Sequence, residues 1–295
     1  MMDTSIIIVS YNTKEVLKNC IESVYANTKD LNFEVIVVDN DSKDGTKELI
    51  TRTFSKHKNF LYIQNRENYG FSKANNIGIK KSSGKFVLFL NSDTLFNQNT
   101  IKKMIDFMSK FPKCGAATCK VLLTTGAIDD SCHRGFPTPW NAFCHFSGLS
   151  KIFPRTKLFG GYNLGFLDLS KTHTIDALAG SFMFVRREAG EDAGWWDEDY
   201  FFYGEDLDFC YTLWHKGWEV YYYPDTFITH LKGVSGGIKK VSKKITTADE
   251  KTRKLATKWR FNAMRIFYKK HYEQKYPWVI TRLVFAGIAL KEKLS

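Results

Sequence analysis

Short runs of consecutive apolar residues alternate with stretches of helical apolar spacing through the first third of the chain. The apolar runs cover residues 5–10, 33–38, 60–64 and 85–90. Such runs are typical of strands buried on both faces of a parallel sheet. The stretch after the first run predicts a helix, with Asn12 as its cap and Glu15 completing a capping box. We therefore predict an α/β fold built on a doubly wound sheet.

Acidic residues follow two of these predicted strands. Ligands of a doubly wound sheet bind at the carboxyl ends of its strands. Asp39 and Asp41 follow the second strand, where a carboxylate can accept the N3–H of a pyrimidine base or a ribose hydroxyl, or can cap the next helix. Asp93 lies at the tip of the fourth strand, where it can hold a divalent cation or cap the helix predicted at 100–108.

A glycine-containing segment, residues 68–78, follows the third strand. Gly70 allows the backbone to approach a ligand closely, and Ser72 or a residue beside it is predicted to begin a helix whose free N–H groups favour phosphate. Lys73 can face solvent or a diphosphate. The segment matches neither the dinucleotide-binding fingerprint nor the Walker loop.

Residues 195–210 carry six carboxylates among aromatic residues, although the whole chain has a formal net charge of +12. Burial beside aromatic rings raises the pKa of some carboxyls and makes proton transfer near neutral pH feasible. An acidic surface turn followed by a helix explains the same residues, with Leu207, Cys210 and Tyr211 on its buried face. Taken alone, the segment is compatible with a catalytic and with a structural role.

Composition and cysteine use limit the class of protein. A hydrophobic content of 43% argues against disorder. The six cysteines form no CxxC pair, which favours free thiols in a reducing compartment. The first residues lack a basic region and a long apolar core, which argues against a secretory signal. We expect a cytoplasmic protein.

The positive charge is concentrated at the end of the chain. From Lys232 onward there are 17 Lys and Arg against 4 Asp and Glu. Gly236 and Gly237 are predicted to form a hinge, followed by the lysine-rich segment 239–244 and a helix from about Ala248. We therefore predict two parts, a domain at 1–237 and a basic amphipathic helical tail at 238–295.

A second helix of the tail, at 278–290, is too short for a confident membrane span. A basic and aromatic amphipathic pair is typical of peripheral attachment to anionic lipid. The same apolar stripes can instead pack on the domain or form a homodimer, and nucleic acid is a distant third partner. Deletion of residues 239–295 is expected to abolish binding to liposomes.

Several sequence motifs occur in an order that is more specific than any one of them. They are IIIVSYN, VVDNDSKDG, ENYGFSKANNIGI, FLNSDT, GSFMFVRR, FFYGEDLDFCYTLWHKGW and PDTFITHLKGVS. Over roughly residues 5–235 the chain resembles inverting family-2 glycosyltransferases of the GT-A fold, and among them rhamnosyltransferase-like members. The resemblance implies a Rossmann-like, mixed and mostly parallel sheet flanked by helices, here with a C-terminal helical appendage.

The resemblance also implies roles for single residues. Asp206 would be the catalytic base with Glu205 as its neighbour, and Asp93 and His230 would bind Mg²⁺ or Mn²⁺. The alternative for His230 is a buried core histidine at the end of an aromatic-rich strand. The implied nucleotide-sugar-binding residues are Ser10, Tyr11, Asn12, Asp39, Asp41, Asn68, Gly70, Phe71, Asn75, Asn91 and Ser92.

One position departs from the family pattern. The metal motif commonly has two aspartates, and here the first is Asn91. With one fewer carboxylate, the site should hold metal more weakly until a nucleotide diphosphate supplies further ligands. Residues 123–176 are aromatic and irregular, and they are compatible with flexible acceptor-recognition loops or with plain surface loops.

The expected activity is inverting transfer of a sugar from a nucleoside diphosphate sugar to a hydroxyl. The acceptor would be a glycan or a polyprenyl-linked molecule in cell-surface polysaccharide synthesis, at the inner face of the cell membrane. The resemblance alone suggests dTDP-rhamnose as the donor. The alternative, motivated by Asn91, is a catalytically silent protein that binds nucleotide sugars or acts as a scaffold at the membrane.

Overall fold

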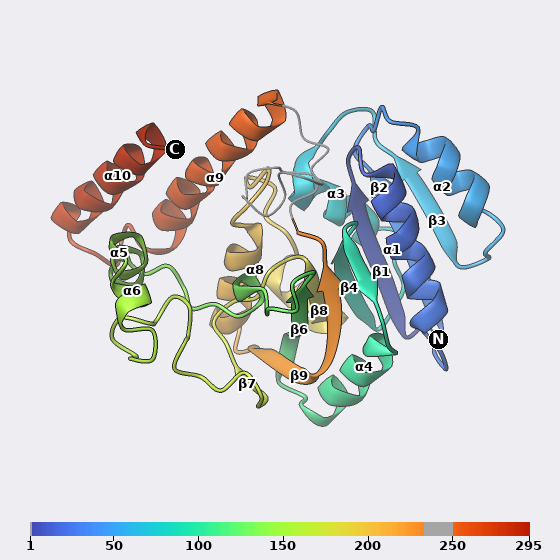
Figure 1. The fold of residues 1–295 in the computed structure, drawn as a ribbon, viewed down its shortest axis with the longest axis horizontal. Helices are drawn as coiled ribbons and strands as arrows, with labels where there is room; N and C mark the ends of the chain where they lie inside the picture. The colour runs from blue at the N-terminus through green and yellow to red at the C-terminus, as the bar shows by residue number, and fades with distance from the viewer. Residues whose placement is uncertain (1, 233–249) are drawn as a thin grey trace.

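The computed structural model describes residues 2–232 and 250–295. Within these residues, nine strands form one mixed sheet in the order β3-β2-β1-β4-β8-β6-β9-β5, with β7 paired to β9 (Figure 1). Strands β1 to β4 run parallel, whereas β8 is antiparallel to both β4 and β6. The strand bounds are β1 Thr4–Ser10, β2 Phe33–Asp39, β3 Phe60–Gln64, β4 Phe86–Asn91, β5 Thr94–Phe96, β6 Cys114–Leu123, β7 His173–Thr174, β8 Phe182–Arg186 and β9 Glu219–His230.

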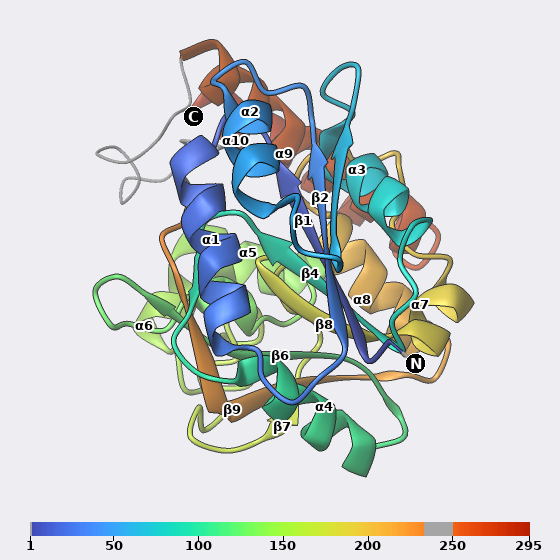
Figure 2. The same ribbon diagram turned by 90° about the vertical axis from the view of Figure 1, so that its right-hand side faces the viewer.

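Helices cover both faces of the sheet, as the doubly wound prediction requires. Figure 2 shows α1 (Lys14–Asn27) and α2 (Thr46–Phe54) on one face of the parallel half and α3 (Gly70–Ile79) on the other. Most residues of β1, β2 and β4 are buried between these layers, whereas β3 lies at the edge of the sheet and is only partly buried. The remaining helices before residue 233 are α4 Thr100–Lys110, α5 Pro139–Ser147, α6 Leu149–Ile152, α7 Arg187–Ala193 and α8 Glu205–His215.

Two predicted helix starts were wrong. Helix α1 begins at Lys14 with Thr13 before it, so Glu15 is only its second residue and no capping box forms. Asn12 instead has a positive φ of 52°, and its Oδ1 accepts a 2.8 Å hydrogen bond from the Lys43 backbone. Helix α3 begins at Gly70, two residues before Ser72.

The second half of the sheet was not predicted in full. Strand β5 has only three residues, which is too short for a periodic pattern to register. Between β6 and β8, the region expected to be irregular contains α5, α6 and a 3₁₀ turn at Asp130–Cys132. All six cysteines are free thiols, which agrees with the prediction, and all six are buried.

Two helices follow the sheet domain, α9 (Glu250–His271) and α10 (Trp278–Lys293). The predicted hinge at Gly236 and Gly237 and the lysine-rich segment 239–244 lie outside the described residues, as does the predicted boundary at 237. An apolar cluster joins α9 to α8 and to the turn before α8 through Tyr200, Tyr211, Ala263, Phe267, Tyr268 and Tyr272. In residues 2–232 and 250–295, no helix combines the length and apolarity needed to cross a membrane.

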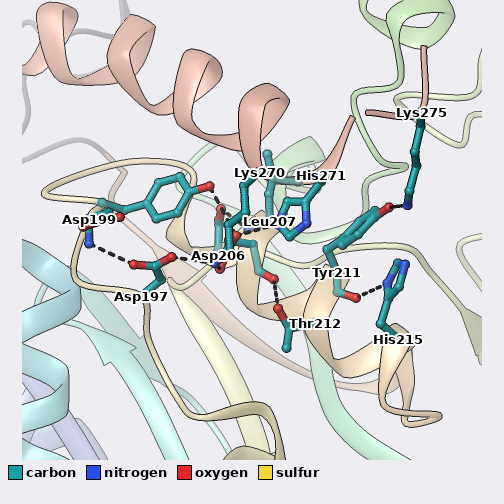
Figure 3. Close-up of polar contacts among 12 residues, drawn as sticks. Asp197, Asp199, Asp206, Leu207, Tyr211, Thr212, His215, Lys270, His271 and Lys275 are labelled. Carbon is teal, nitrogen blue, oxygen red and sulfur yellow. Dashed lines mark hydrogen bonds and ion pairs between the residues drawn. The ribbon is translucent and has the colours of Figure 1, made fainter. Parts of the chain in front are cut away.

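Polar contacts reinforce this packing. Asp208, on the first turn of α8, is 3% exposed. Its two carboxylate oxygens bind Lys270 Nζ at 2.9 Å and His271 Nε2 at 2.6 Å, both from the end of α9. Lys270 also reaches Asp197 in the preceding turn, as Figure 3 shows. Charged groups therefore fix α9 to the start of α8.

We predict that Asp208→Ala lowers the free energy of unfolding by about 3 kcal/mol, because it leaves Lys270 and His271 without their buried carboxylate. Urea unfolding measures this loss. The control is Asp106→Ala, which removes an exposed i,i+4 partner of Lys102 on α4. It should cost no more than about 0.5 kcal/mol. Equal losses in the two variants would contradict a structural role for Asp208.

Candidate active site

A cavity of about 330 Å³ opens at the carboxyl ends of β1, β2 and β4. The strand register aligns these ends, because Ser10 pairs with Asp39 and Val9 pairs with Asn91. The other walls come from the start of α3, the segment after β6, the residues before β8, the turn before α8, the end of β9 and α9. The cavity thus lies where ligands of such a sheet bind.

At one end of the cavity, Asp93 and His230 meet. Strands β5 and β9 pair antiparallel with Thr94 opposite His230, so the residue before β5 lies beside the end of β9. The Leu231 backbone N–H also donates to the Asp93 carbonyl at 2.8 Å. His230 Nε2 lies 3.2 Å from Asp93 Oδ1. A three-residue strand thereby positions both residues of the predicted metal pair.

Asp129 holds the other side of the His230 ring. Its Oδ2 lies 3.2 Å from His230 Nδ1, and its Oδ1 accepts from the Ser131 backbone and from Lys232. Burial alone would raise the pKa of Asp129, but the hydrogen bonds from His230, Lys232 and Ser131 lower it well below its usual range. Sequence reasoning did not single out Asp129 or Lys232.

The same carboxylates act on His230. Burial alone lowers the pKa of His230, but the charge of Asp93 and the hydrogen bonds with Asp129 and Asp93 outweigh it and raise the pKa to about 9. His230 is therefore held between two carboxylates. It is buried, as the alternative interpretation expected, and it also lines the cavity.

Asp93 and His230 fit a divalent cation in one respect. Two neighbouring ligands of an octahedral cation with bonds of about 2.1 Å lie about 3 Å apart, and the two donor atoms are separated by 3.2 Å. In the described parts of the chain, no group of three or more His, Cys, Asp or Glu side chains is arranged to hold a metal ion. These residues thus offer two donors once His230 Nε2 has released its proton, and a cation would need further oxygen ligands from water or phosphate.

Six of the predicted nucleotide-sugar residues line the cavity. They are Tyr11, Asn68, Gly70, Phe71, Asn91 and Ser92. Gly70 has a φ of +80°, and a Cβ there would lie 2.5 Å from the Phe201 carbonyl oxygen. The neighbouring Phe71 N–H donates to that oxygen at 2.7 Å. Gly70 therefore joins the glycine segment to the acidic segment, a role that its sequence context did not reveal.

The other five predicted residues lie outside the cavity lining. The Ser10 hydroxyl contacts the Thr13 hydroxyl. In the loop after β2, Asn12 contacts Ser42 and Lys43, and Asp41 contacts Lys43. Asn75 Nδ2 donates to the Phe71 carbonyl within α3. The fifth is Asp39, which is fully buried.

Asp39 keeps one carboxylate oxygen without a partner. Its Oδ1 accepts from the Ser42 backbone at 2.7 Å and from Gln64 Nε2 at 2.9 Å. Its buried Oδ2 has no hydrogen-bond partner among the described residues. An unpaired buried acceptor costs free energy, so a ligand N–H would stabilise it.

The acidic pair at the start of α8 faces the same cavity. Asp206 Oδ2 forms a 2.7 Å ion pair with Arg134 Nη2, and both side chains are mostly buried. Arg134 also donates to the Leu178 carbonyl at 3.1 Å, and its backbone pairs with Ala177. Sequence reasoning missed Arg134, because nothing in the local pattern links it to a residue 72 positions later.

Glu205 has no such cation partner. Burial, followed by the charge of Asp206, raises the pKa of Glu205 to about 8. Its Oε2 is buried without a hydrogen-bond partner in the described structure. Near neutral pH the neutral form of Glu205 therefore lies beside an ion-paired Asp206. Different charge states in neighbouring carboxyls are typical of acid–base sites.

Helix α9 completes the cavity. Thr252, Leu255, Ala256 and Trp259 line it, and the Trp259 ring stacks on Phe201 with centroids 4.6 Å apart. The part of the chain that sequence reasoning separated as a tail therefore contributes a wall of the candidate site.

The mixed sheet flanked by helices is a GT-A-like fold, and the cavity lies at the carboxyl ends of its parallel strands. Residues 5–156 match the family described as Glycosyl transferase family 2, and residues 86–290 match Glycosyl transferase family group 2. The chain belongs to glycosyl transferase family 2.

Relatives agree with this assignment. Poly-beta-1,6-N-acetyl-D-glucosamine synthase from Staphylococcus aureus (strain COL) is 28% identical over 220 residues, which is 74% of this chain and 47% of that protein. The chain thus spans about half the length of the curated relatives it matches.

Two solved structures share the fold. GalNAc-T7, in complex with UDP, GalNAc and Mn²⁺, is 16% identical with a TM-score of 0.61, over 92% of this chain and 58% of that one. The mannosyltransferase PcManGT from Pyrobaculum calidifontis, in complex with GDP-Man and Mn²⁺, is 16% identical with a TM-score of 0.55, over 97% and 79%. At this identity the likeness concerns the fold.

We predict that Glu205→Gln stabilises the protein more at alkaline than at acidic pH. The pKa of Glu205 is about 8 in the fold against an ordinary value of 4.5, so the folded protein binds a proton that the unfolded chain releases between these values. Because of Glu205, the free energy of unfolding of the wild type falls as pH rises from about 4.5 to about 8. Glutamine does not titrate, so the variant lacks this decrease. Urea unfolding at about pH 5 and about pH 9 measures the difference.

The control is Glu188→Gln, which removes an exposed carboxylate on α7 and reports the general effect of one lost negative charge. If the stability difference between Glu205→Gln and wild type shrank as pH rose, Glu205 would not be a buried neutral acid.

Proposed function

We propose that the protein is an inverting, metal-assisted glycosyltransferase that moves a sugar from a nucleoside diphosphate sugar to an acceptor hydroxyl. The observation that carries the proposal is that one cavity holds both the Asp206–Arg134 pair and the Asp93–His230 pair. A base and a site for leaving-group charge are the two requirements of this transfer. Family membership supports the reaction class.

Asp206 is the proposed base. It accepts the proton of the acceptor hydroxyl while the acceptor oxygen bonds to the anomeric carbon and the bond from that carbon to the diphosphate oxygen breaks. A single displacement of this kind inverts the anomeric configuration. Arg134 fixes the carboxylate from one oxygen, and the Leu207 backbone N–H donates to the other at 2.8 Å. Both contacts hold Asp206 in one orientation.

Asp93 and His230 are the proposed ligands of Mg²⁺ or Mn²⁺. When bound, the cation would neutralise charge on the leaving diphosphate. Asp129 then acts on His230 Nδ1, because a carboxylate at the second ring nitrogen orients a metal-binding histidine. Asn91 supplies no charge at this site, so donor phosphates contribute to cation affinity.

Asp39 is the proposed reader of the nucleobase. Its unpartnered Oδ2 is a suitable acceptor for the N3–H of a pyrimidine, although a small opening of the site is needed to reach it. A pyrimidine nucleotide therefore suits the site, and dTDP-rhamnose is the donor suggested by the motif resemblance. The family relatives extend the candidates to other nucleoside diphosphate sugars.

The proposed acceptor is a glycan or a polyprenyl-linked molecule used in cell-surface polysaccharide synthesis. The name of the Staphylococcus aureus relative, a polysaccharide synthase, supports this setting. Attachment to the inner face of the cell membrane would bring a lipid-linked acceptor to the cavity. A homodimer through the C-terminal helices is the competing use of their exposed surface.

We predict that Asp206→Asn retains donor binding but lowers transfer or donor hydrolysis about a thousandfold, because the amide keeps the shape of the side chain and loses the base. Thermal-shift screening of nucleoside diphosphate sugars with Mn²⁺, dTDP-rhamnose included, identifies a donor. Turnover of that donor is then compared between wild type and variant.

Asp199→Asn is the matched control, since Asp199 is exposed in the same acidic segment and lies outside the cavity lining. It should turn over donor at the wild-type rate. Wild-type turnover by Asp206→Asn would refute the base assignment. Donor binding without turnover by the wild type would favour the catalytically silent alternative.

A further inference from the structure

Helix α10 carries an apolar stripe that the rest of the described structure leaves uncovered. Val279, Leu283, Leu290 and Leu294 share one helical face and are 46%, 64%, 61% and 76% exposed. The opposite face of α10 packs toward α9, where the Phe285 ring lies 5.5 Å from the Tyr268 ring. Helix α10 is therefore apolar on two sides, and only one of them is used within the fold.

A second exposed apolar set lies on α5, α6 and the loop that follows them. Its members are between 46% and 67% exposed, and they are Trp140, Phe143, Phe146, Ile152, Phe153 and Leu158. Ring contacts and a hydrogen bond from Trp140 Nε1 to the Leu158 carbonyl hold the set in place. Large exposed apolar patches mark interaction surfaces.

The two sets adjoin. Lys291 Nζ, near the end of α10, lies 5.8 Å from the centre of the Phe146 ring on α5. Figure 1 shows α5 and α6 beside the α9–α10 pair, at the side of the molecule away from α2 and β3. We call these two sets together the α5–α10 face.

The charges within the segments that carry the α5–α10 face are mostly positive, and the exposed acids Asp168 and Glu273 lie just outside these segments. Residues 131–167 contain no Asp or Glu, and their exposed cations are Lys151, Arg155 and Lys157. Residues 274–295 add Lys275, Arg282, Lys291 and Lys293. The single acid in that second range, Glu292, forms an ion pair with Arg265 of α9. The apolar side chains are thus bordered by exposed positive charge.

We propose that the α5–α10 face is an anionic-lipid-binding surface that lies in the plane of a bilayer. Leucine and aromatic side chains enter the boundary between head groups and acyl chains, while lysine and arginine at the rim contact anionic head groups. A second copy of this chain fits less well, because a like-to-like contact would bring two positive rims together. The proposal deepens the membrane attachment in the proposed function and rests on it.

This surface differs from a membrane-binding tail. Helix α9 binds the sheet domain through Asp208, lines the cavity and packs against α10, so it lies between α10 and the catalytic groups. Segment 139–158 supplies half of the face although it belongs to the sheet domain by sequence. The orientation of the cavity relative to the bilayer is then fixed by two separate contacts.

The test is sedimentation of the full chain with vesicles of phosphatidylcholine, with and without phosphatidylglycerol. Wild type should bind the anionic vesicles at least about tenfold more tightly than the neutral ones. Leu283→Glu with Leu290→Glu and, separately, Phe143→Glu with Ile152→Glu should each weaken binding at least about tenfold. The control is Ser55→Glu with Leu61→Glu, which adds the same two negative charges at exposed positions just after α2 and on β3, far from this face. It should bind vesicles like the wild type.

Loss of binding in only one of the two face variants would overturn the composite face. Equal binding to both kinds of vesicle, or a dimer in solution that both variants dissociate, would overturn the lipid assignment. None of the four substituted positions lines the cavity, so hydrolysis of a soluble donor should stay at the wild-type rate in both variants. If the wild type turns over donor but does not bind vesicles, only this inference is wrong. If the wild type binds vesicles but does not turn over donor, the proposed catalysis is wrong.

Discussion

The first turn of α8 places three carboxyl groups side by side, and the fold gives each a different environment. Asp208 receives Lys270 and His271 from α9, Asp206 receives Arg134, and Glu205 receives no cation and has a pKa of about 8. Three adjacent negative charges in a partly buried turn would repel one another strongly. Satisfying them requires both the segment after β6 and the end of α9. This constraint joins parts of the chain that are far apart in sequence around one cavity.

The sequence predicts what local patterns encode. Continuous apolar runs located the parallel strands to within a residue or two, and polar residues after them located the cavity at the strand ends. The Asp93–His230 approach depends on β5, which is too short to be recognised, and the Arg134–Asp206 pair joins distant segments. Asn12 was misread as a cap because its side chain bonds the loop after β2 rather than its own helix. Long-range contacts of this kind leave no periodic signal.

Helix α9 connects the proposed chemistry to the proposed membrane surface. Its apolar face packs on the sheet domain, its Trp259 stacks on Phe201 at the cavity, and α10 lies on its other side. Removing residues 239–295 would therefore expose a buried cluster and open the cavity as well as remove α10. Substitutions on the exposed stripe separate these effects, which a deletion combines.

The central claim is that Asp93 and His230 mark the leaving-group end of one catalytic cavity. A crystal structure with UDP and Mn²⁺, read by the anomalous scattering of manganese, tests it most directly. The account predicts a manganese peak about 2.1 Å from both Asp93 Oδ1 and His230 Nε2 and in contact with diphosphate oxygens. UDP bound in the cavity with manganese away from both side chains would contradict it.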